Sequence, residues 1–434
     1  MKTEIWVPEY QPPDTLNSEM SRRNFLQFGM SSFLGLVAMQ HLRSAAFAQM
    51  ENIVPHAKRC IVLFMNGGPS QLDTFDPKPG TLNAGPVGAI PTTAEGIQFS
   101  QDLPQVAEQA HHLAVIRSMV SREGNHERAR YLMHTGYAPT GSVRHPTFGS
   151  VASHYLDDED SELPNCVNIN SPSFTAGILG AKHDPFVVND PRKPIDDLKY
   201  PEQMDKRRFE ERLKILRDIE RDFLKNRAGR STEAHQAVYK KADKLINSPS
   251  AKAFDLSDEP IALRNAYGDN RFGQGCLMAR RLIESGVKFV EVSLDGWDTH
   301  SDNFMRTQEL LRVVDPAFAA LVKDLDDRSL LDETIVLWLG EFGRTPKINE
   351  NEGRDHFPNG WSAVIGGGGV RGGRAIGATS EDGTVVLERP VSVPDLFASL
   401  CFALGIDYNN QNYSRAGRPI RVVNNGSVVN ELFA

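Results

Sequence analysis

The feature that most constrains this chain is a series of short apolar runs, each bounded by turn residues and alternating with segments of helical periodicity. Such runs are typical of buried parallel strands, and they predict strands at 59–68, 113–119, 287–296, 333–343 and 362–369. Helices are predicted at 125–136, 273–286, 304–328 and 391–406. This alternation predicts an α/β domain with a largely parallel central sheet that helices cover on both faces.

A highly charged segment interrupts the alternation at residues 202–247. Its apolar residues recur at helical spacing, which predicts a long amphipathic helix or helix pair that covers the domain or closes over its site. We therefore expect one large domain over residues 49–434, with a helical insertion around 200–250.

The N-terminus carries the pattern of an export signal. Arg22-Arg23 precede a moderately apolar stretch, and Ala46-Phe47-Ala48 fits a small-x-small cleavage site. This combination is typical of a bacterial Tat signal over residues 1–48, against the alternative of an amphipathic helix with a chance arginine pair. We expect export by the Tat translocase to the periplasm or outside the cell. No later apolar run reaches the roughly 18 residues that span a bilayer, so we expect no transmembrane helix in the mature chain.

Net charge and cysteine spacing argue against a nucleic-acid-binding surface, a zinc knuckle and a disulfide framework. The net charge of −8 argues against a nucleic-acid-binding surface. The four cysteines are widely spaced and form no CxxC motif: Cys60, Cys166, Cys276 and Cys401. That spacing excludes a zinc knuckle and argues against a disulfide framework. We expect them to be buried small hydrophobic residues.

Ligands of parallel α/β sheets gather beyond the carboxyl ends of the strands. That rule selects four segments of this chain: Asn66 to Asp73, Asn125-His126, Asp295 to His300 and Glu341 to Arg344.

The stretch "DGWDTHSDNF" supplies Asp295, Asp298 and His300 within six residues. Carboxylate oxygen with imidazole nitrogen suits zinc, manganese or iron. The loop "GRDHFPNGW" adds Asp355 and His356, with His356 the expected ligand and Asp355 its orienting partner. The alternative interpretation of both segments is a set of polar surface loops.

The order of motifs resembles that of a known family. "RCIVLFMNGGPSQLDTFDPKP", "NHERARYLMHTG", "LDGWDTH", "LWLGEFGRTP" and "GRDHFPNGWSAVIGGGGVRGG" together resemble the bacterial sulfatase-like proteins catalogued as domain of unknown function 1501. That family is grouped with the alkaline phosphatase superfamily. The resemblance covers nearly the whole mature chain. It implies an alkaline-phosphatase/sulfatase-like three-layer sandwich and metal-supported hydrolysis or transfer of phosphate or sulfate esters.

The resemblance also implies roles for the segment after the second strand. Sulfatases place a cysteine nucleophile ten residues before a Thr-Gly pair. Counting back from Thr135-Gly136 puts His126 at the nucleophile position and Arg130 at that of the motif's anion-binding arginine. The cysteine that would become formylglycine is absent.

The implied metal ligands are retained in part. Asp298 (or Asp295), His300 and His356 match one of the superfamily's two metal positions. Gly67-Gly68 stand where the other position has an acidic ligand, so that Asp73 would have to substitute. In "GEFG", Glu341 keeps the carboxylate, whereas Phe342 replaces a histidine.

The residue types suggest how such a site would act. A helix N-terminus lowers the pKa of an imidazole, so we expect His126 to be neutral and to act as nucleophile, base or metal ligand, unless it only bonds the local backbone. Arg130 shares its helix face, and Arg344 could supply a second cationic clamp. Ser70 lacks a Gly-x-Ser-x-Gly elbow. Trp297 and Trp361 either stack on a sugar or wall a loop.

The sequence therefore predicts an exported, metal-dependent hydrolase of phosphate or sulfate esters, with small-molecule or glycan substrates. Its divalent ion would be zinc, manganese, calcium or iron. The catalytic candidates are His126, Arg130 and Arg344, and the metal-binding candidates are Asp298, His300, His356, Glu341, Asp73 and Asp295. The alternative is a non-catalytic Tat-exported binding or assembly protein that keeps the fold.

Overall fold

The computed structural model describes residues 56–158, 161–195, 198, 200, 204–226, 242–246, 248–414 and 416–433. The expected Tat signal lies outside these residues, as does part of the expected insertion. None of the helices in the described ranges is both long enough and apolar enough to span a membrane.

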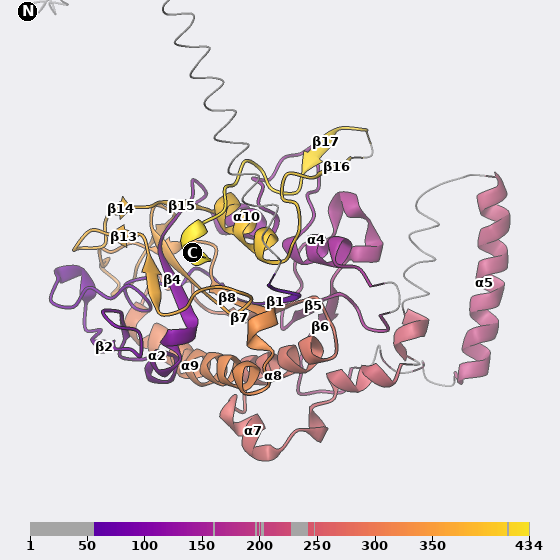
Figure 1. Ribbon diagram of the computed structural model, residues 1–434, viewed down its shortest axis with the longest axis horizontal. Helices are drawn as coiled ribbons and strands as arrows, with labels where there is room; N and C mark the ends of the chain where they lie inside the picture. Colours follow the sequence, from indigo (N-terminus) through magenta and orange to yellow (C-terminus); the bar gives the residue numbers. More distant parts are fainter. Residues whose placement is uncertain are drawn as a thin grey trace, which may run out of the picture. The chain divides into compact units, whose positions relative to one another are not determined.

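A nine-stranded sheet lies at the centre of the described part of the chain (Figure 1). Its order is β12-β4-β11-β8-β1-β7-β5-β6, and β15 pairs with β4. The strands are β1 (Arg59–Asn66), β4 (Leu113–Val120), β5 (Cys166–Ile169), β6 (Phe186–Val188), β7 (Phe289–Asp295), β8 (Thr334–Leu339), β11 (Trp361–Gly366), β12 (Arg374–Ile376) and β15 (Val391–Ser392). Every pairing is parallel except those of β11, which runs against both β4 and β8. The predicted α/β class with a largely parallel sheet is confirmed.

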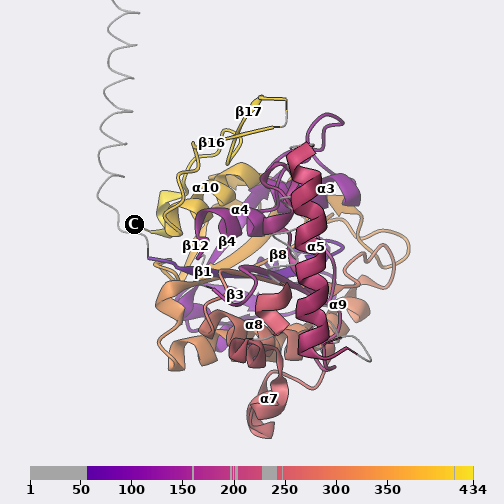
Figure 2. The ribbon, with the colours of Figure 1, turned by 90° about the vertical axis from the view of Figure 1, so that its right-hand side faces the viewer.

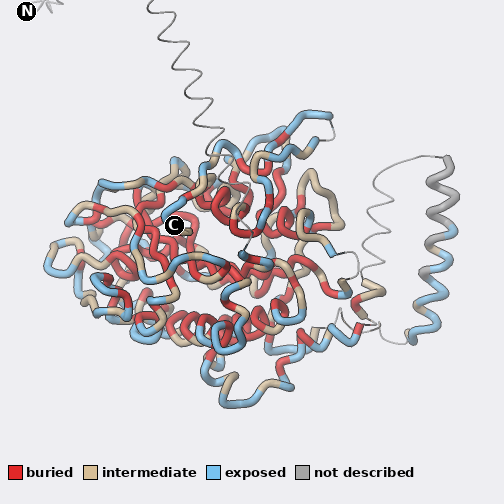
Figure 3. Tube along the Cα trace, viewed as in Figure 1, coloured by how far each residue is buried: buried red, intermediate tan, exposed pale blue. Residues whose placement is uncertain are grey.

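Helices cover both faces of the sheet, as Figures 1 and 2 show. One layer contains α2 (Pro104–Glu108), α8 (Arg271–Glu284) and α9 (Asn303–Asp327), and the other contains α3 (His126–Thr135), α4 (Phe148–Tyr155) and α10 (Val393–Ala403). Successive side chains of β1 divide between the two cores: Ile61 and Leu63 pack with the first layer, Val62 and Phe64 with the second. Because side chains alternate across a strand, the continuous apolar run of β1 supplies both cores. Buried residues gather in the central sheet and in the helices beside it (Figure 3).

Further helices and strands of the described chain lie outside the nine-stranded sheet. The predicted amphipathic helix is α5 (Lys206–Asn226), and α7 (Ile261–Ala266) follows it. Two-stranded sheets are formed by β2 (Ala89–Pro91) with β3 (Gln98–Ser100), β9 (Gly343–Arg344) with β10 (His356–Phe357), β13 (Ala378–Thr379) with β14 (Val386–Glu388), and β16 (Gln411–Tyr413) with β17 (Pro419–Arg421). All four cysteines are buried, as expected.

The strands nearest the centre end level with one another, which brings their following loops together. Asn66, the last residue of β1, pairs in register with Asp295, the last residue of β7. The segments selected by the sequence therefore leave the sheet at the same edge.

Candidate metal centre

The candidate site is built from loops that follow different strands. His126 is the first residue of α3, after β4, and Asp298 and His300 lie in the turn after β7. Glu341 follows β8, and His356 begins β10. Asn125 caps α3 by accepting a hydrogen bond from the Arg128 N–H, and the left-handed Gly136 ends it, so the helix begins at His126 as the sequence predicts.

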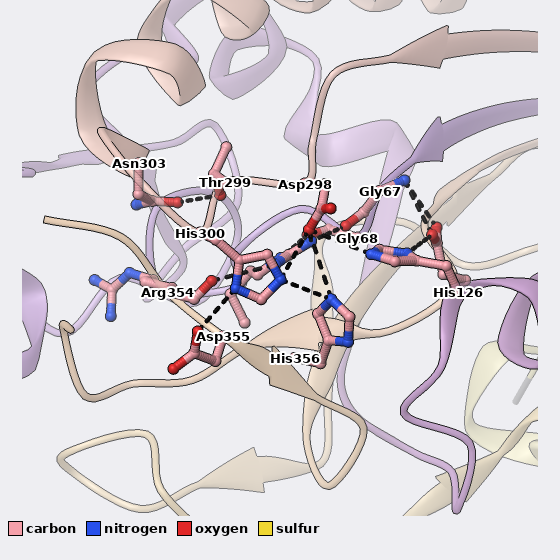
Figure 4. Close-up of polar contacts among 12 residues, drawn as sticks. Gly67, Gly68, His126, Asp298, Thr299, His300, Asn303, Arg354, Asp355 and His356 are labelled. Carbon is pink, nitrogen blue, oxygen red and sulfur yellow. Dashed lines mark hydrogen bonds and ion pairs between the residues drawn. The ribbon is translucent and has the colours of Figure 1, made fainter. Parts of the chain in front are cut away.

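Three imidazole rings converge on one carboxylate oxygen (Figure 4). The Oδ1 atom of Asp298 lies 3.2 Å from His126 Nε2, 3.2 Å from His300 Nε2 and 3.5 Å from His356 Nε2. The Nε2 atoms of His300 and His356 are 3.0 Å apart. His126, Asp298 and His356 each offer a ligand atom within 4.8 Å of the others.

In each of the three rings, the Nδ1 atom lies within hydrogen-bond distance of an acceptor oxygen. His126 Nδ1 lies 2.7 Å from Glu341 Oε1, His300 Nδ1 lies 2.8 Å from Asp355 Oδ1, and His356 Nδ1 lies 2.7 Å from the carbonyl oxygen of Gly124. Because carboxylates and carbonyls accept hydrogen bonds, each Nδ1 must carry the hydrogen. In a neutral ring the Nε2 atom then presents a bare lone pair.

These lone pairs all point at a carboxylate oxygen. Because electron-rich atoms repel one another, the arrangement needs a positive charge between them. His126 Nε2 is buried and has no hydrogen-bond partner among the described residues. Orienting acceptors behind metal-binding histidines are the usual support of a metal site. Three imidazoles and one carboxylate fit zinc, iron or manganese, whereas calcium prefers oxygen ligands. The side chains of His300 and Asp298 are 47% and 48% exposed, so one side of the site is open.

Asp298 is anchored by a buried arginine. Arg344 Nη2 lies 2.7 Å from Asp298 Oδ1, and the Arg344 side chain is fully buried. Partial burial would raise the pKa of Asp298, but the hydrogen bond and charge of Arg344 outweigh it and lower that pKa to about 2. The carboxylate is therefore ionised and ready to bind a cation.

Gly67 and Gly68 have a structural role at the end of β1. The Gly67 N–H donates to both oxygens of Glu341, at 3.0 and 3.1 Å, and both glycine carbonyls accept from Arg344. Gly67 has a φ of +120°, and a Cβ there would lie 2.4 Å from the backbone nitrogen of Asp298. Only glycine allows this close approach.

The family model described as a protein of unknown function (DUF1501) matches residues 57–433. The chain belongs to the DUF1501 family. No curated protein sequence matches it.

Solved structures similar to this DUF1501 chain include a synthase, a sulfatase and an alkaline phosphatase. The lipoteichoic acid synthase LtaP from Listeria monocytogenes has 9% identity, covers 85% of this chain and 75% of its own, and has a TM-score of 0.38. The PsFucS1 sulfatase from Pseudoalteromonas sp. has 12% identity, with coverage of 86% and 71% and a TM-score of 0.37. A mutant TAB5 alkaline phosphatase with bound Mg has 13% identity, with coverage of 82% and 100% and a TM-score of 0.35. Scores this low carry neither a residue correspondence nor an activity over to this chain.

Other candidates of the DUF1501 chain lie outside the histidine cluster. Asp73 is buried, and its oxygens lie 2.8 and 3.1 Å from the Arg354 guanidinium and 2.7 Å from Asn303 Nδ2. Asp295 is exposed and accepts a hydrogen bond from Asn66 at 2.6 Å. The Arg130 side chain has no polar contact with the cluster among the described residues. The structure thus brings together His126, Asp298, His300, Glu341, Arg344 and His356.

The structure corrects three details of the expected site. The α3 N-terminus does not lower the pKa of His126: the hydrogen bond from its ring to Glu341 raises that pKa, although partial burial acts against it. Asp355 orients His300, not His356. Arg344 is turned inward to Asp298 and to carbonyls of the glycine turn, so it does not face solvent as a substrate clamp.

Three further side chains are explained by burial. Ser70 is 1% exposed, and its hydroxyl has no hydrogen-bond partner in the part of the chain that the structure describes, which argues against a nucleophile. Trp297 and Trp361 are 0% exposed, so they wall the core and cannot stack on a sugar.

The sequence interpretation missed Arg354, which organises the ligand loop. Its guanidinium is fully buried against Asp73, and its backbone N–H donates to the Thr299 carbonyl at 3.0 Å. Gly353 packs so closely that a Cβ there would lie 1.9 Å from the His300 carbonyl oxygen. The signal for this contact was an arginine and a glycine directly before Asp355.

Replacing Asp355 by asparagine is expected to weaken metal affinity by about 10–100-fold, because His300 loses the carboxylate that fixes its ring and tautomer. Titration of the metal-free protein with Zn²⁺ measures the change. Asp302→Asn, at an exposed aspartate two residues after His300, should leave the affinity unchanged. Equal affinities for the two variants would contradict the orienting role of Asp355.

Proposed function

We propose that this DUF1501 protein binds one divalent metal ion through His126, Asp298, His300 and His356 and uses it to hydrolyse phosphate or sulfate esters. The observation that carries the proposal is the convergence of three Nε2 atoms, each with its Nδ1 held by an acceptor, on the Oδ1 atom of Asp298. Zinc, iron or manganese fits this donor set best. A bound ion would supply Lewis-acid polarisation of the ester and an acidified water.

The chain's own residues prepare the site for that chemistry. Arg344 holds Asp298 in its ionised form, and Glu341 and Asp355 fix two of the rings. The half-exposed faces of Asp298 and His300 leave room for an ester to approach. Arg130 stands one helical turn after His126 on α3, so we propose that it contacts the transferred anionic group.

Water is the proposed attacking group. Among the described residues, the side chains that form hydrogen bonds or ring contacts with the four proposed ligands belong to Arg306, Glu341, Phe342, Arg344, Asn349 and Asp355, and none carries a hydroxyl or thiol. The proposal therefore makes His126 a ligand instead of a nucleophile. Tat export, the periplasmic or secreted location and the extent of the helical insertion remain proposals that rest on the sequence.

A non-catalytic binding protein is the second candidate. The inward position of Arg344 favours it, because that guanidinium then does not reach a substrate. The Arg130 side chain also makes no polar contact with the cluster among the described residues. In that case the ion would be structural, and the open side would serve no reaction.

The deciding experiment compares the metal content and ester hydrolysis of the folded wild type with those of a His300→Ala, His356→Ala double variant. We expect about one ion per chain in the wild type and none in the variant, since two of four ligands are lost. A His111→Ala, His112→Ala variant, which removes two neighbouring histidines elsewhere, controls for nonspecific binding. Equal metal content in all three proteins would overturn the metal site. A bound ion without hydrolysis of any phosphate or sulfate ester would favour the binding protein.

A further inference from the structure

A second cluster of functional side chains surrounds the far end of α3. Tyr137 follows the helix, and its ring stacks on that of His145 with a centroid separation of 4.0 Å and an interplanar angle of 4°. The stack is fixed: the His145 N–H donates to the Tyr131 hydroxyl at 2.9 Å, and that hydroxyl lies 3.1 Å from His145 Nδ1.

Exposed arginines gather around this stack. Arg144 precedes His145, and its carbonyl accepts from the Ile178 N–H at 3.2 Å. Arg418 and Arg421 come from the β16–β17 hairpin, which the Tyr137 hydroxyl joins to the helix end by donating to the Arg421 carbonyl at 2.6 Å. Burial and the charge of Arg418 together lower the pKa of His145.

The positive charge of the cluster is not neutralised locally. In the described part of the chain no carboxylate forms an ion pair with Arg144, Arg418 or Arg421, whereas at least ten other arginines have acidic partners. All three are exposed. Such a cluster is unexpected in a chain with a net charge of −8, and it would attract a polyanion.

The cluster and the candidate metal centre stand at opposite ends of one helix. His126 begins α3, and Thr135 ends it just before Tyr137, a length of about 15 Å at 1.5 Å per residue. A polymer bound along this helix could place one anionic group at the metal centre and others at the arginines.

We infer that Arg144, Arg418 and Arg421, with the Tyr137–His145 stack, form a binding surface for an anionic glycan chain whose ester is the substrate of the metal centre. Planar guanidinium groups match sulfate and phosphate oxygens. The Tyr137 ring, held by its stack on the buried His145, is partly exposed and can contact a sugar. Duplex DNA is also a polyanion, so it serves as the comparison ligand that separates a glycan surface from a general polyanion surface. The inference deepens the proposed function and rests on it for the identity of the reacting group.

The test measures binding of dextran sulfate, with neutral dextran and duplex DNA as comparison ligands. An Arg144→Ser, Arg418→Ser, Arg421→Ser variant is expected to bind dextran sulfate about tenfold more weakly than the wild type. A Lys252→Ser, Arg312→Ser, Lys323→Ser variant is the control, because it removes the same charge at three other exposed positions. Arg312 and Lys323 lie on α9, and Lys252 precedes α8. This control should bind dextran sulfate within about twofold of the wild type. Binding should weaken as salt is added.

Hydrolysis separates this inference from the proposed function. The Arg144, Arg418, Arg421 variant should show a raised KM for a sulfated or phosphorylated polysaccharide and unchanged kcat on a small ester. Loss of dextran sulfate binding in a protein that hydrolyses nothing would support the surface and overturn the hydrolase. Equal binding by the two triple variants, or binding of duplex DNA as tight as that of dextran sulfate, would overturn the glycan surface.

Discussion

Asp298→Asn is expected to release the bound ion and to lower ester hydrolysis by roughly 1000-fold or more, because several kcal/mol of charge stabilisation depend on the ion. The asparagine oxygen can still accept from Arg344 Nη2, which lies 2.7 Å from Asp298 Oδ1. The fold should therefore survive the substitution. Metal content and initial rates on a phosphate and a sulfate ester are the measurements.

Asp295→Asn is the matched control for this prediction. Asp295 lies three residues earlier, is exposed, and contacts the Asn66 side chain instead of the histidine cluster. Its replacement should change neither metal content nor rate. If Asp295→Asn lost the ion and Asp298→Asn kept it, the proposed ligand set would be wrong.

Asp73→Ala is expected to lower the free energy of unfolding by about 3–5 kcal/mol, the usual cost of leaving a buried charge without its partner. Asp73 and Arg354 are both 0% exposed, with Asp73 Oδ2 and Arg354 Nε 2.8 Å apart. Urea denaturation measures the change. Chains that remain folded should keep the ion, since Asp73 does not touch the histidine cluster.

A double variant shows whether the loss comes from the unpaired charge. Asp73→Ala with Arg354→Met removes both charges, so it should recover much of the stability lost in Asp73→Ala. If Asp73→Ala instead kept its stability and lost the ion, Asp73 would be a metal ligand, as the sequence alone suggests.

The sequence predicts the fold well because strands that are buried on both faces have continuous apolar runs. The continuous apolar run of β1 and the helical pattern of residues 125–136 are local features, and each predicted the element that forms. The rule for carboxyl ends of parallel strands then placed Asp298, His300 and Glu341 at one edge. The antiparallel direction of β11 could not be predicted in this way, because an apolar run predicts a buried strand but not its direction relative to the neighbouring strands.

The pairing of side chains within the site could not be predicted in the same way. Asp355 and His356 are adjacent, yet Asp355 contacts His300 whereas His356 Nδ1 contacts the Gly124 carbonyl. The partner of each residue depends on how the loop that carries His300 packs against the loop that carries Asp355 and His356. One such contact is the close packing of Gly353 against the His300 backbone. The sequence suggests Arg344 as a cationic clamp and assigns Arg354 no role, because nothing local shows that both guanidinium groups are buried.

The proposed ligands stand at positions 126, 298, 300 and 356, on segments that meet only when β4, β7 and the β9–β10 hairpin have assembled. An unfolded chain would hold the ion poorly, so binding would draw the folding equilibrium toward the native state by about 2.7 kcal/mol at a hundredfold excess of free ion over its Kd. Metal supply during maturation would then govern how long newly made chains resist proteolysis. The abundance of the protein would follow the metal status of the compartment in which it matures.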